Sequence, residues 1–199
     1  MKTKIILKVL LATIIFLGMN QAILAQSNFK IGKSTANEMN ISGTSSFHDW
    51  KMKTSNFSGK AACTIGADNQ VSKLSLLEFS LPVLTLKSGQ KKLDKNAYKA
   101  LKTEQFKEIL YKQTQAKVMS FTNSKSHIKT EGKLTVAGVS KDVIIDLYCF
   151  EKKDGSMSCD GNYQINMSDY NVTPPVFMGG IMKTGEAITL AFSLQFEKY

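Results

Sequence analysis

Arginine is absent from this chain of 199 residues, and histidine is almost absent. All 26 basic residues are lysines, so the chain lacks the planar guanidinium group that dominates specific contacts with guanine and phosphate. This absence argues against sequence-specific binding of nucleic acid. The two histidines, His48 and His127, lie 79 positions apart, whereas a metal site needs several ligands at short, defined spacing. We therefore predict neither a metal ion nor a cofactor.

Sequence motifs typical of enzymes are also missing. The chain contains no Gly-x-Ser-x-Gly elbow, no phosphate-cradling glycine loop and no dinucleotide fingerprint. His48 is followed directly by Asp49, but adjacent residues of a strand point to opposite faces, so the two make a poor acid–base pair. The sequence predicts a protein that is not an enzyme, and it favours a structural or ligand-contacting role for His48 over a catalytic one.

Cysteine is scarce, with three residues in the chain. Cys149 and Cys159 flank the turn signal at residues 153–156, so antiparallel strands on either side of that turn would place them nearly opposite each other. The cross-strand Cβ separation of about 4.5–5.5 Å is close to what a disulfide needs. We predict a structural Cys149–Cys159 disulfide, with Cys63 left as a buried, unpaired thiol.

Only the N-terminus carries a long hydrophobic run. Three lysines within the first eight residues precede the predominantly apolar run of nine residues from Val9 to Leu17, and small and apolar residues follow up to Ala25. This order is typical of a secretory signal cut between Ala25 and Gln26. The alternative, a membrane anchor, would need about 20 apolar residues. We expect residues 1–25 to be a cleaved signal, residues 26–199 to form a single domain, and the protein to be periplasmic or secreted.

Positive charge is concentrated in one segment of the predicted domain. Loss of the three signal-segment lysines lowers the formal net charge from +10 to +7. Residues 87–117 contain nine lysines and three acidic residues, a surplus of +6. A solvated face is the simpler interpretation of this surplus, and a patch for an anionic ligand or a membrane surface is the alternative.

Period-two alternation of apolar residues recurs along the chain and predicts an all-β fold. It is clearest where Ile188, Leu190, Phe192, Leu194 and Phe196 alternate with smaller or polar residues. The strong strand predictions cover residues 71–81, 116–121, 132–136, 143–150, 163–167 and 188–196, and the weaker ones cover residues 38–41, 50–54 and 58–65. Within the first of these, two consecutive leucines at positions 76 and 77 indicate a bulge. About eight short strands joined mostly by hairpins favour an antiparallel barrel over a sandwich.

Two segments interrupt the strand pattern. Asp94 is a good N-cap and is followed by residues without a helix breaker, so we predict a short helix over residues 95–103. Residues 169–185 contain two prolines and three glycines, which predicts a long loop with an apolar middle. Alternation alone shows which residues face inward, and it leaves open whether they fill the barrel or line a cavity.

Several motifs resemble those of the YceI-like polyisoprenoid-binding proteins. Residues 43–50 resemble the early Ser-x-x-His strand and turn of that family, and residues 93–102 resemble its middle helix. Residues 132–141 are similar to its Gly-x-Leu-Thr-x-x-Gly-Val-Thr-Lys signature, with Ser140 in place of threonine. Residues 163–170 and 184–196 resemble its last two strands, although the arginine usual near position 167 is missing.

This resemblance implies an eight-stranded antiparallel lipocalin-like barrel that holds an isoprenoid or similar long-chain lipid. The candidate ligand-binding residues are apolar or aromatic: Phe79, Leu81, Tyr98, Leu101, Phe121, Leu134, Val136, Ile145, Leu147, Tyr163, Ile165, Met167, Phe177, Met178, Leu190, Phe192 and Leu194. Lys91, Lys92, Lys95 and Lys99 are candidates for attracting an anionic headgroup, and transient contact with a membrane surface is a related expectation. Two rival functions are an enzyme with His48 as base and a packed barrel with a stress or interaction role. The sequence does not indicate an oligomeric state.

Overall fold

The computed structural model of the protein describes residues 26–66, 68–122, 125–177 and 181–199. The predicted signal segment, residues 1–25, lies outside the described residues. The strands are β1 (Gln26–Ile31), β2 (Glu38–Ser45), β3 (Trp50–Thr54), β4 (Ser58–Ile65), β5 (Val71–Pro82), β6 (Glu108–Thr122), β7 (Lys125–Val136), β8 (Val139–Glu151), β9 (Met157–Asn166), β10 (Val176–Phe177) and β11 (Met182–Lys198). The helices are the α-helix α2 (Lys91–Ala100) and the short 3-10 helices η1 (Val83–Thr85) and η2 (Ser168–Tyr170).

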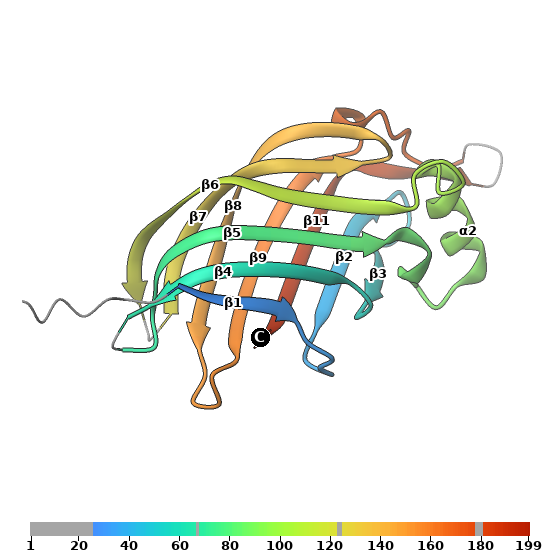
Figure 1. Cartoon of the computed structure of the whole chain (residues 1–199). Coiled ribbons are helices and arrows are strands. Elements are labelled where there is room, and N and C mark those ends of the chain that lie inside the picture. The colour runs from blue at the N-terminus through green and yellow to red at the C-terminus, as the bar shows by residue number, and fades with distance from the viewer. Residues whose placement is uncertain (1–25, 67, 123–124, 178–180) are drawn as a thin grey trace, which may run out of the picture.

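Eight strands close into an antiparallel ring, in the order β1, β4, β5, β6, β7, β8, β9 and β11 (Figure 1). The ring closes because β1 pairs with β4 on one side and with the last residues of β11 on the other. This confirms the predicted all-β, lipocalin-like barrel with one short helix.

The β2–β3 hairpin extends the barrel wall at one end. β11 pairs with β1 through residues 196–198 and with β2 through residues 184–193, so β2 continues the wall where β1 stops. A single bridge between Lys53 and Lys87 then links β3 to the chain after β5. The hairpin thus widens the wall at the end of the barrel that carries α2 (Figure 1).

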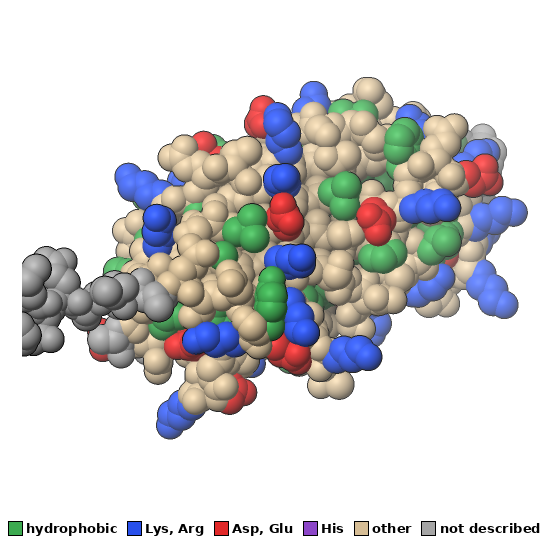
Figure 2. All heavy atoms as spheres, in the orientation of Figure 1, with side chains coloured by type: hydrophobic (Ala, Val, Ile, Leu, Met, Phe, Trp, Pro, Cys, Tyr) green, Lys and Arg blue, Asp and Glu red, His purple; other side chains and the backbone are tan. Residues whose placement is uncertain are grey.

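The predicted helix is present, but its boundaries were wrong. It spans Lys91–Ala100 instead of residues 95–103, and Gln90 occupies the N-cap position without a side-chain hydrogen bond. Asp94 lies inside the helix because its carboxylate accepts hydrogen bonds from the backbone N–H and the hydroxyl of Ser88, at 2.8 and 2.6 Å. Figure 2 shows lysine side chains gathered at the end of the molecule that carries this helix.

The predicted loop over residues 169–185 contains regular structure that its prolines and glycines obscured. Its first residues belong to η2, and Val176 and Phe177 form β10, which pairs with Met182 and Lys183 at the start of β11. β11 therefore begins several residues earlier than the alternation indicated. Met178 lies outside the described residues, and for Phe177 only the backbone position is described.

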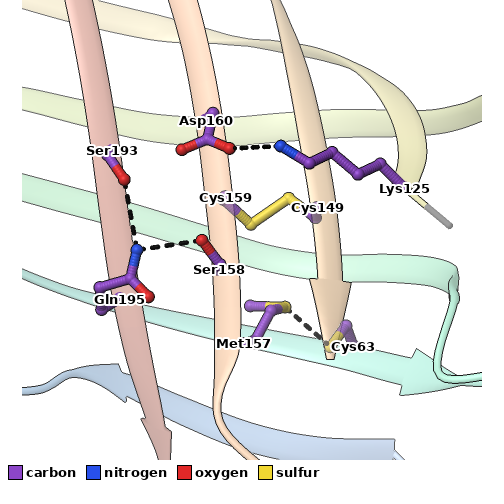
Figure 3. The surroundings of a disulfide bond; sticks show 9 residues. All are labelled: Cys63, Lys125, Cys149, Met157, Ser158, Cys159, Asp160, Ser193 and Gln195. Carbon is purple, nitrogen blue, oxygen red and sulfur yellow. Dashed lines mark hydrogen bonds and ion pairs between the residues drawn. A yellow bond between two sulfur atoms is a disulfide. The ribbon is translucent and has the colours of Figure 1, made fainter. Parts of the chain in front are cut away.

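The end of the barrel opposite α2 is packed with large side chains. Phe29 and Phe196 are fully buried, and Met157 is 1% exposed. The Cys63 thiol lies 3.8 Å from the sulfur of Met157, and Cys149 and Cys159, opposite each other on β8 and β9, form a disulfide beside them (Figure 3). Both predictions for the cysteines agree with this arrangement, in which Cys63 is buried and unpaired.

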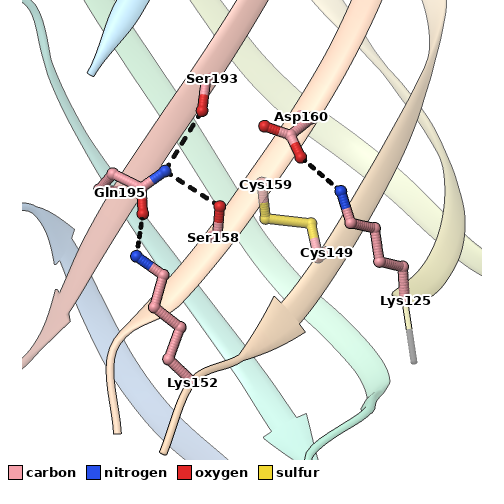
Figure 4. A network of polar contacts seen from close by, with 8 residues as sticks. All are labelled: Lys125, Cys149, Lys152, Ser158, Cys159, Asp160, Ser193 and Gln195. Atoms are coloured by element: carbon pink, nitrogen blue, oxygen red, sulfur yellow. Dashed lines mark hydrogen bonds and ion pairs between the residues drawn. A yellow bond between two sulfur atoms is a disulfide. The ribbon is translucent and has the colours of Figure 1, made fainter. Parts of the chain in front are cut away.

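Polar contacts cover the outside of this packed end. The Gln195 amide donates hydrogen bonds to the hydroxyls of Ser158 and Ser193, at 3.0 and 3.2 Å, and accepts one from Lys152 (Figure 4). Lys125 forms an ion pair of 2.8 Å with Asp160 on the neighbouring part of the wall. These contacts fix the strands around the disulfide. No helix within the described ranges has the length and hydrophobicity needed to span a bilayer.

Candidate functional site

An apolar cavity of about 310 Å³ occupies the end of the barrel beneath α2. Its wall consists mainly of aliphatic and aromatic side chains from β2, β3, β6, β7, β9, β11 and the helix. A volume near 300 Å³ is at the lower end of the range for small-molecule sites, which are typically concave and apolar with a few polar groups. The interior is therefore packed at one end and hollow at the other, an arrangement that alternation alone had left open.

The cavity opens to solvent at His48, Gln90 and Lys92, three exposed residues that also line it. We call this opening the mouth. His48 and Gln90 belong to the loops before β3 and before α2, and Lys92 lies in the first turn of α2. The other polar residues of the lining are Ser45, Asn96, Tyr170 and Thr184, and the rest of the wall is apolar.

Two aromatic rings lie directly below the residues that line the cavity, and we call this level the floor. Tyr111 and Phe192 are the next inward-facing residues below the lining residues Ile109 and Leu190 on β6 and β11. Each ring is accommodated by a glycine on a nearby strand: a Cβ on Gly132 would lie 2.7 Å from the Tyr111 hydroxyl, and one on Gly161 would lie 2.5 Å from Phe192 Cζ. Each glycine lets a ring lie flat against the neighbouring strand, Tyr111 of β6 over Gly132 on β7 and Phe192 of β11 over Gly161 on β9.

The inner face of α2 forms the cover of the cavity. Leu93, Ala97 and Leu101 line the cavity from this helix, and none of its residues is fully buried. The helix is held to the chain before it by the Tyr98 hydroxyl, which donates a 2.6 Å hydrogen bond to the carbonyl of Leu86. A cover with few buried contacts belongs to the low-stability part of a fold, where local opening requires least free energy.

Trp50 lies in the cavity wall opposite the cover. It is the only tryptophan of the chain. Its indole N–H donates a 3.1 Å hydrogen bond to the carbonyl of Thr44, and its ring lies against Gly43, where a Cβ would come within 2.5 Å of it. The ring is therefore fixed in place and provides a spectroscopic reporter inside the site.

The structure places no acid–base pair at His48. The hydroxyl of Ser45 hydrogen-bonds the backbone carbonyl of His48 at 2.6 Å, whereas no described residue hydrogen-bonds the imidazole. The other histidine, His127, lies 2.7 Å from Asp146 outside the cavity lining. The described residues also contain no cluster of side chains that could hold a metal ion.

The predicted ligand-binding residues separate into groups by height along the barrel. The cavity is lined by six of them: Leu101, Leu134, Val136, Ile165, Met167 and Leu190. A second group packs in or against the core without lining the cavity: Phe79, Leu81, Ile145, Leu147, Tyr163, Phe192 and Leu194. Tyr98 anchors the cover instead of lining the site.

Phe121 does not belong to the interior. Its side chain is 51% exposed, near the end of β6 that is remote from the mouth. Pairing between β5 and β6 ends at Lys112, so the later residues of β6 lack a neighbouring strand on that side and Phe121 remains uncovered. The prediction of a wall position for this residue was wrong because the ladder stops before reaching it.

Sequence reasoning missed several residues that line the cavity. Trp50, Leu86 and Ile109 come from a weakly predicted strand, a connecting segment and the start of β6, which have too few alternating residues to indicate a buried face. Tyr170 was expected in a loop, yet it is 2% exposed and lines the cavity. A sequence signal for Tyr170 exists only in the motif shared with the family.

Burial changes the chemistry of Tyr170. Desolvation raises the pKa of its phenol from the ordinary value of 10.0 to about 12, and the neighbouring Tyr163 and Asp169 add to the shift. No described residue hydrogen-bonds the hydroxyl. The folded state therefore disfavours the ionised phenol, so ionisation of Tyr170 lowers the stability of the fold.

We expect Tyr170→Phe to make the protein more resistant to alkali. Because the folded-state pKa is raised, the contribution of the phenol is complete below about pH 10 and is lost as the pH rises toward about 12. The variant should match the wild type at neutral pH and exceed its unfolding free energy by about 1 kcal/mol near pH 11, one pH unit above the ordinary pKa of the phenol. Urea unfolding followed by circular dichroism measures this. The control is Tyr199→Phe, at a site 63% exposed, and equal pH dependence of the two variants would contradict the prediction.

Comparisons with known proteins agree with this architecture. The model of the YceI-like domain matches residues 25–196. A polyisoprenoid binding domain from Saccharophagus degradans, implicated in plant cell wall breakdown, superposes with a TM-score of 0.63 at 11% identity, covering 88% of this chain and all of that one. BcnA of Burkholderia cenocepacia gives 0.60 at 14% identity, covering 79% and 95% of the two chains.

The YCEI protein of Campylobacter jejuni has a TM-score of 0.56 at 17% identity, and the match covers 74% of this chain and 84% of that chain. No curated protein sequence matches the chain. At these identities the solved structures show a shared fold, while the family match extends over nearly the whole described part of the sequence. The chain therefore belongs to the YceI-like domain family.

Proposed function

We propose that the protein is an exported carrier that holds the apolar chain of an isoprenoid or a similar lipid in the cavity beneath α2. The observation that carries this proposal is a cavity of about 310 Å³ whose lining is mostly aliphatic and aromatic, with the exposed residues His48, Gln90 and Lys92 among its few polar ones. Transfer of apolar surface out of water contributes roughly 25 cal/mol per Å² buried, so such a wall binds hydrocarbon without any specific polar contact. The fold shared with a polyisoprenoid binding domain supports the same ligand class.

The shape of the site limits how the lipid is held. Because the cavity has a volume of about 310 Å³ and the barrel below Tyr111 and Phe192 is packed, the site should accept a short chain or one end of a longer chain, with the remainder extending through the mouth. A polar headgroup would then lie near His48, Gln90 and Lys92. Of the four lysines expected to attract a headgroup, Lys92 is the one that lines the cavity.

Export is part of this proposal. Residues 1–25 have the composition of a cleavable signal, and the Cys149–Cys159 disulfide is suited to an oxidising compartment such as the periplasm. Outside the inner membrane, a long apolar molecule needs a protein to shield it from water during transit. A carrier requires no acid–base pair, in keeping with the isolated imidazole of His48.

Fluorescence of Trp50 tests the proposal directly. Titration of the purified protein with geranylgeraniol should produce a saturable change in the emission of this single tryptophan, because the indole lies in the cavity wall. Ala97→Phe, which fills the cavity from the cover, should weaken binding by at least about tenfold. The matched control is Ala187→Phe on the exposed side of β11, which should bind as the wild type does.

Two results would contradict the proposed carrier function. One is an unchanged Trp50 emission up to the solubility limit of the alcohol, together with a bare protein mass in native mass spectrometry. The other is equal affinity of the Ala97→Phe and Ala187→Phe variants, which would place any bound lipid outside the cavity. A bare mass with a saturable titration would instead indicate that the ligand was lost during purification.

A further inference from the structure

The outer face of α2 carries a row of lysines that does not face the cavity. Lys91, Lys95 and Lys99 are spaced by four residues and therefore lie on one side of the helix. The residues that line the cavity, such as Leu93 and Ala97, lie on the opposite side. All three lysines are exposed, so their ammonium groups point away from any lipid held inside.

These lysines have no acidic partners among the described residues. The ion pairs of the described chain involve none of the three. The one acidic residue of the helix, Asp94, is engaged by the N–H and hydroxyl of Ser88. The row therefore presents uncompensated positive charge to the solvent beside the mouth.

Exposed apolar residues also lie beside the mouth. Phe47 is 67% exposed, Val176 is 59% exposed and Ile181 is 70% exposed. Phe47 precedes His48 at the mouth, and Val176 follows Pro175, which lines the cavity. Exposed apolar side chains mark a surface that binds a partner when they form one contiguous patch.

Backbone contacts hold these apolar residues together. The N–H of Ser46 donates to the carbonyl of Lys183 at 3.0 Å, and the N–H of Lys183 donates to the Ser46 hydroxyl at 3.1 Å. Val176 pairs with Lys183 in the β10–β11 ladder. The turn after β2 and the start of β11 therefore form one rim, at the end of the barrel that carries α2 (Figure 1).

We propose that this mouth face binds the surface of a bilayer that contains anionic phospholipid. The apolar rim of Phe47, Val176 and Ile181 enters the interface, and the lysine row of α2 contacts the phosphate headgroups. Basic side chains combined with apolar ones are what binds a protein to the plane of a membrane surface. The orientation places the cavity opening against the bilayer, so a lipid passes between the two without crossing water. The proposal rests on the proposed carrier function and adds the donor or acceptor surface.

Vesicle binding of the full mature protein tests the lysine row. The protein should co-sediment with vesicles of phosphatidylcholine mixed with phosphatidylglycerol, and much less with phosphatidylcholine alone. Each lysine near an anionic surface contributes about a fivefold factor in affinity, so Lys91→Gln, Lys95→Gln and Lys99→Gln together should weaken binding about 100-fold at low salt. The matched control replaces Lys60, Lys73 and Lys117, three exposed lysines on the barrel wall, and should bind nearly as the wild type does.

A second pair of variants tests the apolar rim. Phe47→Ser with Ile181→Ser should weaken vesicle binding at least about tenfold through the loss of buried apolar surface. Its control is Met119→Ser with Phe121→Ser, which removes exposed apolar residues from the far end of β6. An equal loss in both pairs, or in both lysine triples, would overturn the proposal because it would reflect net charge or hydrophobicity alone.

Titration of Trp50 with geranylgeraniol separates this proposal from the carrier function. Rim and lysine-row variants should keep the wild-type affinity for the alcohol in solution, because the replaced side chains do not line the cavity. A wild-type protein that binds the alcohol but no vesicle of either composition would overturn the docking proposal, leave the carrier function standing and assign the mouth face to a protein partner. Vesicle binding without a response of Trp50 would overturn the carrier function and leave a membrane-binding barrel.

Discussion

Phe192→Ala is expected to lengthen the cavity and to shift the preferred ligand toward a longer isoprenoid. The Phe192 ring lies over Gly161, between Leu190, which lines the cavity, and Leu194, which is buried in the packed end. With alanine at this position the floor retreats toward Leu194 and the disulfide, which are the next inward-facing residues on β11 and β9. The added space lies in line with the existing cavity, so an extended chain fills it without bending.

The size of the effect follows from the apolar surface that the longer chain buries. Each buried methylene contributes about 0.8 kcal/mol, so one more isoprene unit of about five carbons gains up to 4 kcal/mol before the cost of ordering the chain. We expect the variant to prefer geranylgeraniol over farnesol by about 100-fold more than the wild type does. Titration of Trp50 with each alcohol measures this ratio.

The control for this prediction is Leu194→Ala, a truncation that lies one step deeper in the packed end. Both variants lose roughly 2–4 kcal/mol of stability through the cavity they create, but the Leu194 site is 4% exposed and does not adjoin the existing cavity. Chain-length preference should therefore change in Phe192→Ala alone. An equal change in both variants would mean that general loosening of the barrel, and not removal of the floor, sets the length of the bound chain.

The inward-facing residues of the barrel were largely predictable from the sequence, because side chains alternate strictly between the two faces of a strand. Leu134, Val136, Ile165 and Leu190 were chosen on this basis and line the cavity. The bulge in β5 was also predictable: Leu74 and Leu76 pair with the consecutive residues Cys63 and Ala62, which leaves one extra residue between them.

The level of each inward-facing residue along the barrel axis, and so whether it lines the cavity, was not predictable from the sequence. Leu190 and Leu194 are the same residue type at inward-facing positions of the same strand. Even so, Leu190 lines the cavity and Leu194 packs below the floor. The difference arises from Tyr111 and Phe192, whose rings meet glycines on other strands. Such contacts depend on the register of neighbouring strands, which alternation within a single strand does not contain.

Local signals were misleading where tertiary contacts compete with them. Asp94 has the composition of an N-cap, but Ser88 binds its carboxylate and the helix begins earlier. In the sequence, the surplus of lysines in residues 87–117 forms a single charged segment. In the structure, helix α2 places Lys92 at the mouth and the row of Lys91, Lys95 and Lys99 on its outer face. Helical geometry separates a lysine near the ligand from lysines that face a surface.

Removal of the disulfide is expected to cost about 3 kcal/mol of stability without loss of the fold. Cys149 and Cys159 are 10 residues apart. Cross-linking a short loop of this kind lowers the conformational entropy of the unfolded chain and stabilises the folded state by about 3 kcal/mol. The double variant Cys149→Ala, Cys159→Ala should therefore show a lower urea midpoint under oxidising conditions. The ring of paired strands around the bond remains, so far-ultraviolet circular dichroism should be unchanged.

Cys63→Ala provides the matched control, because Cys63 is also fully buried at the packed end but forms no cross-link. Its unfolding free energy measures the packing contribution of one buried sulfur, and the double variant should lose about 3 kcal/mol beyond twice that value. A loss no greater than twice the control would show that the bond contributes only packing. Because both sulfurs of the disulfide are at most 2% exposed, native protein should resist reduction by a thiol reagent that reduces the unfolded chain rapidly. The stabilised form then depends on oxidation before or during folding, which links the stability of the protein to the compartment in which it folds.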